Sequence, residues 1–381
     1  MQTTAKSLSR RGFMGILGTG AAAAALRPGL AALELTAAAE TASAAAPLVD
    51  TVVRLSSNEN PYGPAPTAFT AMRKAFGLAW RYPDEQADAL AADLAQLHGL
   101  GDDHILLGNG SSEILRLAAA AFTGPGRPVV MADPTFEAVA GYAAHGGADT
   151  VKIPLASGSR HDLPAMLRAG AGGGLLYLCN PNNPTATVTP KGEVRDFLSR
   201  VPAGTAVLVD EAYFHYAESG DYESVIPLVQ DHPNLIVART FSKIHGMAGL
   251  RLGYAVARPE TRTRLRGQQA WDSLNLMAIV AARASLKDAG HLERSRRLNR
   301  ETREWLRSEL EKMGYRLLPS EANFVMIDLR RDVGPTIEAL KGRRVEVGRR
   351  FPALPSFLRV TIGTRPQMEA FLAAFRQVSG G

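Results

Sequence analysis

The stretch TFSKIHGMAGLRLGY, residues 240–254, contains a lysine in a setting where its amine could do chemistry. Ser242 directly precedes Lys243, and Arg251 follows the lysine by eight positions. The apolar run LIVA (235–238) leads into the stretch, so the lysine comes just after a predicted strand. A lysine amine attacks aldehydes when burial and neighbouring cations lower its pKa, and an arginine beside a serine can clamp a phosphate. Taken alone, the pattern also fits a solvated basic loop.

Four further polar groupings each follow an apolar run of the kind that forms buried strands. They are GNGSSE, DPTF, NPNNPTAT and DEAY, and RTFSK at the lysine is the fifth. In open α/β sheets, ligands bind in the crevice beyond the carboxyl ends of the strands. Any one grouping is weak evidence, but five at the same edge of a predicted sheet indicate one binding site.

Two of these groupings could hold the phosphate and one face of an anionic, ring-bearing aldehyde cofactor. Ser111 and Ser112 open a predicted helix, where backbone N–H groups and the helix dipole attract a phosphate. A plain helix N-cap is the alternative for these serines. Phe136 could stack on a planar ring, although a lone aromatic is more often a core residue.

The remaining groups could bind the ring itself. Asn183 offers a donor to a ring oxygen, and an Asn-Pro turn is its alternative. Asp210 ends an apolar strand, where an unpaired carboxylate is costly to bury. A protonated ring nitrogen would pair with it, and so would an ordinary N-cap. Tyr213 could donate to the same ring oxygen as Asn183, which leaves Lys243 to form a Schiff base with the aldehyde.

Six apolar runs predict the strands that must position these groups. Most are uninterrupted, as expected when helices cover both faces of a parallel sheet. Amphipathic windows at 111–122 and 196–201 predict helices between the strands. The alternation favours an α/β layered domain with a predominantly parallel sheet. The strand runs are 104–108, 128–132, 175–179, 206–210, 235–239 and 253–257.

The pattern changes on either side of this domain. Residues 260–313 form a long charged region that is predicted to be helical. The strand-like segments ANFVMIDL (322–329) and FLRVTIGT (357–364) follow it, which predicts a smaller α+β domain. Residues 52–66, VVRLSSNENPYGPAP, are rich in Pro, Asn and Gly, so they predict an extended arm with turns and no regular element.

The first 46 residues have the features of an export signal. Arg10 and Arg11 precede Phe13 and a short Gly/Ala-rich apolar stretch, and the order S-R-R-G-F resembles the twin-arginine (Tat) type. We therefore expect a signal peptide and linker at 1–46, use of the Tat export machinery, and a periplasmic or other extracytoplasmic location. A disordered tail is the alternative. GILGTG lacks the preceding strand of a dinucleotide loop, and the apolar stretch is short for a membrane span.

Composition excludes several function classes. The chain has 381 residues and a net charge of +6, with no long Lys/Arg block, so nucleic-acid binding is not expected. Cys179 is the single cysteine, which excludes an internal disulfide framework. The eight histidines form no HExxH or similar ligand pair, so no metal site is expected. A serine hydrolase is disfavoured because the sequence has no G-x-S-x-G.

The motifs NPNNPT, DEAY and TFSKxxxxAGLRLGY resemble those of the fold type I pyridoxal-phosphate enzymes of the class I/II aminotransferases. SSNENPYGP, RYPD at 81–84 and FLRVTIGT are similar to the histidinol-phosphate aminotransferase branch. The resemblance covers residues 52–381. It implies an N-terminal arm at 47–75, a large cofactor-binding domain at 76–258 with a mostly parallel seven-stranded sheet between helices, and a small α+β C-terminal domain at 259–381.

The resemblance also implies a role for each candidate residue. Lys243 would bind pyridoxal 5′-phosphate as a Schiff base and move the substrate proton, and Asp210 would keep the pyridine nitrogen protonated. Asn183 and Tyr213 would bond the ring oxygen, and Phe136 would stack on the ring. The phosphate would be held by Ser111, Ser112, Ser242 and Arg251.

Further residues are implied to bind the substrate or a second subunit. Tyr82 of RYPD would reach the cofactor phosphate of the neighbouring subunit, which implies a homodimer. Arg359 resembles the arginine that clamps the substrate α-carboxylate. Asn60 and Arg349 fall where this branch contacts the distal part of the substrate. The expected partners are an amino donor, either an amino acid or an amino-alcohol phosphate, and a 2-oxo acid.

Two departures from the family pattern bear on this interpretation. Ala186 stands where the motif usually has glycine, and a positive φ there would strain alanine by roughly 1 kcal/mol while Asn183 stays in place. Histidine biosynthesis is cytoplasmic, so an export signal argues against a role in that pathway. Decarboxylation or oxidation of amino acids on the same scaffold is the alternative reaction, and a binding protein without turnover is the third interpretation.

Overall fold

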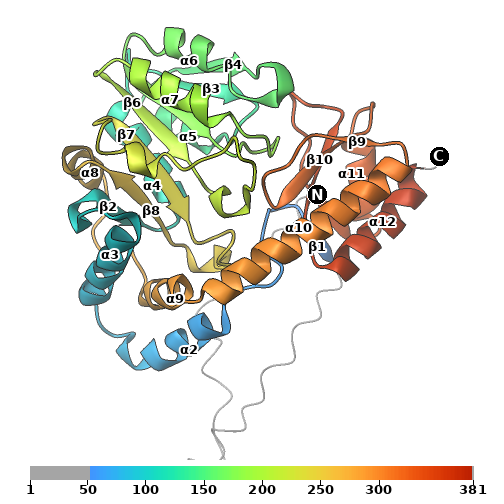
Figure 1. Ribbon diagram of the computed structural model, residues 1–381, viewed down its shortest axis with the longest axis horizontal. Coiled ribbons are helices and arrows are strands. Elements are labelled where there is room, and N and C mark those ends of the chain that lie inside the picture. Colours follow the sequence, from blue (N-terminus) through green and yellow to red (C-terminus); the bar gives the residue numbers. More distant parts are fainter. Residues whose placement is uncertain (1–51, 380–381) are drawn as a thin grey trace, which may run out of the picture. The chain divides into compact units, whose positions relative to one another are not determined.

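The computed structural model describes residues 52–379. These residues contain a seven-stranded sheet, with helices on both sides of it (Figure 1). The strand order is β2-β8-β7-β6-β5-β3-β4. All six predicted strands are confirmed. The strands are β2 Ile105–Gly108, β3 Val129–Asp133, β4 Thr150–Pro154, β5 Gly174–Cys179, β6 Thr205–Asp210, β7 Leu235–Thr240 and β8 Gly253–Ala257.

The sheet is mostly parallel, as predicted, because only β8 runs antiparallel to its neighbours β2 and β7. The direction of β8 matters for the site, since it places the residues just before Gly253 at the edge where the other strands end. The sequence interpretation missed β4. This edge strand, TVKIP, is half-exposed and has no continuous apolar run that would have revealed it.

Helices cover both faces of the sheet, and successive strand residues alternate between the two layers. Leu176 and Leu178 of β5 pack into one core cluster, whereas Leu175 and Tyr177 pack into the other. Because both faces are buried, the strands have the uninterrupted apolar runs seen in the sequence. One layer holds α4 Ser111–Phe122, α5 Ala138–His145 and α8 Pro259–Arg266, and the other holds α2 Pro66–Ala75, α3 Asp84–His98, α6 Leu163–Ala169, α7 Lys191–Arg200 and α9 Leu276–Leu286.

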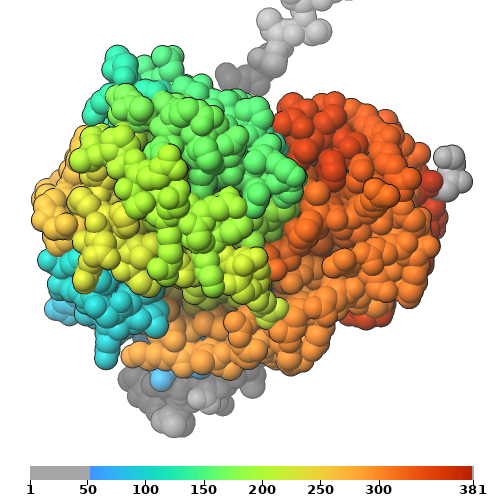
Figure 2. All heavy atoms as spheres, turned by 45° about the horizontal axis from the view of Figure 1, so that its top comes forward, coloured from blue at the N-terminus to red at the C-terminus, as the bar shows by residue number. Residues whose placement is uncertain are grey.

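A smaller α+β layer follows, as predicted. Its three-stranded antiparallel sheet has the order β12-β10-β9. The residues of this part, orange to red, lie directly against the green segments of the larger part in the space-filling view (Figure 2). Its elements are β9 Arg316–Leu317, β10 Phe324–Asp328, β11 Val345–Val347, β12 Phe357–Thr361, α10 Ala289–Lys312, α11 Gly334–Lys341 and α12 Arg365–Ser379.

The arm contains a regular element that the sequence interpretation excluded. β1, Val53–Leu55, pairs in parallel with β11. Three residues are too few to show a periodic pattern, so this prediction was wrong for a physical reason. The two strands form a separate two-stranded sheet, which ties the start of the arm to β11 of the smaller part, and residues 56–64 then run in turns toward α2.

The long charged region 260–313 is three helices, α8, α9 and α10. Asn275 caps α9 by accepting from the backbone N–H of Ala278, and Asp288 caps α10 by accepting from that of His291. α8 contacts α4, and α9 contacts α2 and α3. The division between domains at residue 258 therefore stays a prediction.

Single-turn 3₁₀ helices complete the described chain, at Phe76–Leu78, Asp102–His104, Ser157–Ser159, Phe214–Tyr216, Ile226–Leu228 and Ala248–Leu250. Within residues 52–379, no helix combines the length and apolar character needed to cross a membrane. The predicted export signal at 1–46 lies outside the described residues.

Candidate active site

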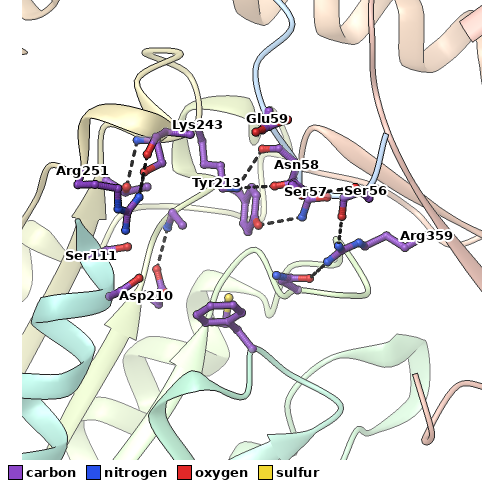
Figure 3. A pocket seen from close by; sticks show the side chains of 18 residues that line it. Ser56, Ser57, Asn58, Glu59, Ser111, Asp210, Tyr213, Lys243, Arg251 and Arg359 are labelled. Carbon is purple, nitrogen blue, oxygen red and sulfur yellow. Dashed lines mark hydrogen bonds between the residues drawn. The ribbon is translucent and has the colours of Figure 1, made fainter. Parts of the chain in front are cut away.

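A cavity of about 390 Å³ lies at the carboxyl ends of the parallel strands, between the large sheet, the arm and β12 (Figure 3). Its volume is in the range of small-molecule sites. Ten of the thirteen predicted site residues line it, namely Ser111, Ser112, Phe136, Asn183, Asp210, Tyr213, Ser242, Lys243, Arg251 and Arg359. The five polar groupings thus converge, as the sequence predicted.

Lys243 enters the cavity from the loop after β7. Its Nζ donates to the backbone carbonyl oxygens of Ser57 at 3.1 Å and Asn58 at 2.9 Å. Burial, together with the nearby Arg359 guanidinium, lowers the pKa of this amine to about 8. At neutral pH a fraction on the order of a tenth is therefore unprotonated, which is the form that attacks an aldehyde.

Asp210 is a buried carboxylate at the end of β6, with only 3% of its surface exposed. Its Oδ2 accepts from the Tyr177 hydroxyl at 3.0 Å, and its Oδ1 accepts from the backbone N–H of Ala212 at 3.1 Å. No ion pair within residues 52–379 includes Asp210, and burial raises its pKa to about 6. A cationic N–H in the cavity would compensate the cost of burying this charge.

The N-terminus of α4 forms a seat for an anion. Gly110 precedes the helix with φ of 76°, and a Cβ at this position would lie 2.3 Å from Arg251 Nη2. Only glycine therefore lets the arginine approach the free N–H groups of the first helical turn. Arg251 Nη1 donates to Ser242 Oγ at 3.4 Å and to the carbonyl oxygen of Ala248 at 2.9 Å. The antiparallel β8 brings this arginine to the strand ends.

Asn183 and Tyr213 also present polar groups to the cavity. Asn183 Oδ1 accepts from Arg359 Nη1 at 2.7 Å, so the amide nitrogen is left as a donor. The Tyr213 hydroxyl accepts from Asn58 Nδ2 at 3.0 Å, and burial raises the pKa of this phenol. Phe136 lines the wall of the cavity and is partly exposed.

Arg359 reaches the cavity from β12 of the smaller sheet. Its Nη2 donates to the carbonyl oxygen of Ser56 at 2.6 Å, whereas its Nε is buried without a hydrogen-bond partner. Burial also lowers the pKa of this guanidinium. A buried guanidinium with a free N–H is a suitable partner for a carboxylate or phosphate of a ligand.

Three predicted residues lie outside the cavity lining. Asn60 is buried, and its Nδ2 donates to the carbonyl oxygen of Ile244 at 2.8 Å, so it braces the lysine loop. Arg349 forms an ion pair of 2.6 Å with Glu137, with both side chains about half-exposed. Tyr82 lies on the surface, with 74% of it exposed. Their substrate and subunit contacts stay predictions.

The sequence interpretation missed three residues that hold the site together. Tyr177 contacts Asp210, and Asn58 contacts Tyr213. No local sequence pattern marks contacts between residues so far apart in the chain. Glu113 ends the GNGSSE grouping, but no role in the site was predicted for it. Its Oε2 accepts from the backbone N–H of Asn109 at 2.6 Å and from Ser273 Oγ at 3.1 Å, which stabilises the turn before α4. The spacing of a carboxylate in the first helical turn could have suggested this.

Ala186, which stands where the motif usually has glycine, has φ of 62°. This positive φ is the conformation that was predicted to strain an alanine. Its methyl group is fully buried beside Tyr213, Tyr216 and Phe324. Removing the methyl relieves roughly 1 kcal/mol of strain but loses about 0.8 kcal/mol of burial. Asn183 stays in the cavity lining despite the substitution.

We therefore expect Ala186→Gly to change the free energy of unfolding by less than about 1 kcal/mol, as measured by urea denaturation. Ala118→Gly in α4 is the matched control. It removes an equally buried methyl from a helix interior without relieving strain, so it should destabilise by about 2 kcal/mol. Equal losses for both variants would show that Ala186 carries no strain.

The cavity suits a ligand with three groups. A phosphate would bind at the anion seat, an aldehyde would react with the Lys243 amine, and a basic ring nitrogen would pair with the buried Asp210 carboxylate. Pyridoxal 5′-phosphate carries all three, and its ring nitrogen would supply the ion-pair partner that the buried Asp210 carboxylate lacks within residues 52–379. The protein is a pyridoxal-phosphate-dependent aminotransferase of the fold type I architecture. Residues 50–375 match the family model of aminotransferase class I and II, and the chain belongs to this family.

Curated relatives and solved structures agree with this assignment. The chain is 44% identical to the histidinol-phosphate aminotransferase of Symbiobacterium thermophilum over 334 residues, which is 86% of this chain and 91% of the relative. It is 40% identical to that of Moorella thermoacetica, covering 87% and 86%. The structure of the Sinorhizobium meliloti histidinol-phosphate aminotransferase in complex with pyridoxal-5′-phosphate matches with a TM-score of 0.82 and 29% identity, covering 86% of this chain and 91% of that one.

Proposed function

We propose that this protein transfers an amino group from an anionic amino donor of the histidinol-phosphate type to a 2-oxo acid. The observation that carries the proposal is the buried Arg359, whose Nε has no partner within the described residues and which lies in the same cavity as Lys243. The names of the relatives support the choice of donor. Arg349, beside Phe351 near the smaller sheet, supplies a second guanidinium for a distal anionic group.

The bound cofactor supplies an aldehyde for the exchange of the amine and a ring that takes up the electron pair of the substrate Cα. Asp210 would pair with the ring nitrogen, and Asn183 and Tyr213 would donate to the ring oxygen. Phe136 would cover one face of the ring. The residues that would hold the phosphate are Ser111, Ser112, Ser242 and Arg251.

The residues of the chain itself then account for binding and proton transfer. Lys243 would hold the cofactor between turnovers, and its free amine would accept and return the proton at the substrate Cα. An amine with a pKa of about 8 is well matched to this exchange near neutral pH. Arg359 would orient the substrate by a bidentate contact, and the arm and the smaller sheet would exclude water from the cavity.

The test is to record the visible spectrum of the cofactor-loaded protein while amino donors, including histidinol phosphate, are added one at a time. The proposal predicts that one anionic donor bleaches the yellow band and that a 2-oxo acid restores it.

We expect Arg359→Lys to raise the KM for this donor by at least about tenfold. Arg350→Lys is the control, since Arg350 pairs with Asp332 on the surface. An unchanged KM in Arg359→Lys would contradict the proposal.

Decarboxylation is the second candidate reaction, because the scaffold alone does not choose between the two. The L-threonine-O-3-phosphate decarboxylase of Porphyromonas gingivalis shares the fold, with a TM-score of 0.73 at 21% identity. The same donor panel separates the reactions. Release of carbon dioxide without formation of a keto acid would favour decarboxylation.

We also propose a homodimer in which Tyr82 reaches the cofactor of the neighbouring subunit. Tyr82 is 74% exposed, and two large apolar side chains of the same surface hollow are exposed as well, Leu78 at 43% and Trp80 at 75%. Exposed patches of this kind commonly form subunit interfaces. We expect a dimer by light scattering and a cofactor affinity about tenfold lower in Tyr82→Phe, since one hydrogen bond to the phosphate is lost. A monomer with full cofactor occupancy would contradict the proposal.

We also propose that residues 1–46 are an export signal that directs the protein out of the cytoplasm by the Tat route, because the S-R-R-G-F order resembles Tat signals. Replacing Arg10 and Arg11 with lysine should leave the protein in the cytoplasm, as measured by cell fractionation. Export of this double variant at the wild-type level would contradict a Tat route.

A further inference from the structure

Asn58 lies where several hydrogen bonds of the cavity meet (Figure 3). It is 1% exposed, with φ of 55°, in the left-handed region where asparagine is one of the few common non-glycine residues. Its carbonyl oxygen accepts from Lys243 Nζ at 2.9 Å and from Asn323 Nδ2 at 3.0 Å. Its side-chain Nδ2 donates to the Tyr213 hydroxyl at 3.0 Å. One buried residue therefore contacts both the amine and the phenol of the site.

The neighbouring Thr361 fixes the orientation of the Asn58 amide. The backbone N–H of Asn58 donates to Thr361 Oγ1 at 2.9 Å, so the threonine hydroxyl keeps its own proton to donate. It donates this proton to Asn58 Oδ1 at 3.1 Å. The amide oxygen therefore faces Thr361, and the amide nitrogen faces Tyr213.

This orientation determines where the Tyr213 proton points. A hydroxyl group has one proton to donate and two lone pairs that accept. Because the Tyr213 oxygen accepts from Asn58, its proton remains available for a partner inside the cavity. A flipped amide, or a carboxylate in its place, would instead attract the phenol proton away from the cavity.

We propose that Asn58 is a positioning residue, which directs the Tyr213 hydroxyl proton toward the ring oxygen of bound pyridoxal phosphate. The inference rests on the proposed role of Tyr213 and does not depend on the identity of the amino donor. Thr361 lies on β12, two residues after Arg359, so the smaller sheet sets the orientation of Tyr213 in the loop that follows β6 of the larger sheet.

Asn58→Asp tests the proposal against a purely structural role in the arm. Aspartate also tolerates a left-handed backbone and can still accept from Thr361. Its carboxylate cannot donate, so it would turn the Tyr213 proton away from the cavity. If Asn58 only shapes the arm, this substitution should affect the site independently of Tyr213.

The measurement is a pH titration of the visible band of the cofactor-loaded protein in wild type, Asn58→Asp, Tyr213→Phe and the double variant. A donor to the ring oxygen favours its ionised form, so losing the donor raises the pKa of the band. We expect a rise of about one pH unit in each single variant, and at most about half that effect for Asn58→Asp in the Tyr213→Phe background.

Equal effects of Asn58→Asp in both backgrounds would overturn the proposal, while the role of Tyr213 would stand. No shift in Tyr213→Phe would overturn both.

Asn58→Gly is the second variant if the aspartate protein does not fold, since it keeps the backbone angle and removes the amide. Its smaller shift should disappear in the Tyr213→Phe background, and its persistence there would overturn the proposal. Asn234→Asp is the matched control, because Asn234 donates to the Ala203 carbonyl on the surface, and it should cause no shift.

Discussion

Replacing Lys243 with alanine is expected to lower the rate of transamination by about a thousandfold or more. The variant loses both the covalent anchor of the cofactor and the amine that moves the substrate proton. The measurement is the rate of keto acid formation with the best amino donor of the panel, at saturating pyridoxal phosphate. Saturation ensures that weaker binding of the cofactor does not account for the loss.

Lys312→Ala is the matched control for this substitution. The Lys312 amine pairs with Glu309 on the exposed side of α10 and is not part of the cavity lining, so its loss should leave the rate unchanged. A Lys243→Ala protein with a rate within about tenfold of wild type would contradict the assignment of the lysine.

Asp210→Asn is expected to lower kcat by about a hundredfold or more, because asparagine keeps the shape of the side chain but cannot carry the negative charge. The amide oxygen can still accept from the backbone N–H of Ala212. The loss would therefore report the charge that stabilises a protonated ring nitrogen. Steady-state kinetics at fixed pH measure the effect.

Tyr177→Phe separates the charge of Asp210 from its hydrogen bonding. It removes the hydroxyl that donates to Asp210 Oδ2 at 3.0 Å and leaves the carboxylate in place. The negative charge of Asp210 remains when this one hydrogen bond to it is lost, so this variant should lose about tenfold in activity, less than Asp210→Asn. Equal losses in the two variants would indicate that the charge is unimportant.

The same carboxylate should destabilise the cofactor-free protein as pH rises. Burial raises its pKa from 3.8 to about 6, so the folded state binds the proton more tightly than the unfolded state. Stability from this group is thus fully present below about pH 4 and is lost between pH 4 and 6. We expect Asp210→Asn to gain roughly 2 kcal/mol in the free energy of unfolding, relative to wild type, between pH 4 and 7. Urea denaturation at several pH values measures this difference, and a difference that does not change with pH would contradict the expectation.

The large sheet and its binding edge could be predicted because their signals are local. Strands buried on both faces are continuous apolar runs, and the groups that bind ligands follow them directly, as Asp210 follows β6. β4 has exposed residues at the sheet edge, and β1 has three residues that pair with a segment almost 300 positions away. Their strand character comes from tertiary contacts, which a single sequence window does not contain.

The hydrogen bonds that orient the site residues could not be predicted from the sequence, because they join residues far apart in the chain. Asn58 and Tyr213 are 155 positions apart, and Asn58 and Thr361 are 303 apart. Family motifs identified Lys243 and Arg359 because each lies in a distinctive local string. The contact between Tyr177 and Asp210 depends on neighbouring strands and became visible only when β5 and β6 were paired.

The most direct test of the account is to reduce the cofactor-loaded protein with borohydride, digest it, and locate the pyridoxyl group by peptide mass mapping. Reduction makes the bond between the cofactor and its lysine permanent. We expect a single modified site, Lys243, in the peptide that follows β7. Modification of another lysine, or no modification in protein that shows the yellow band, would contradict it.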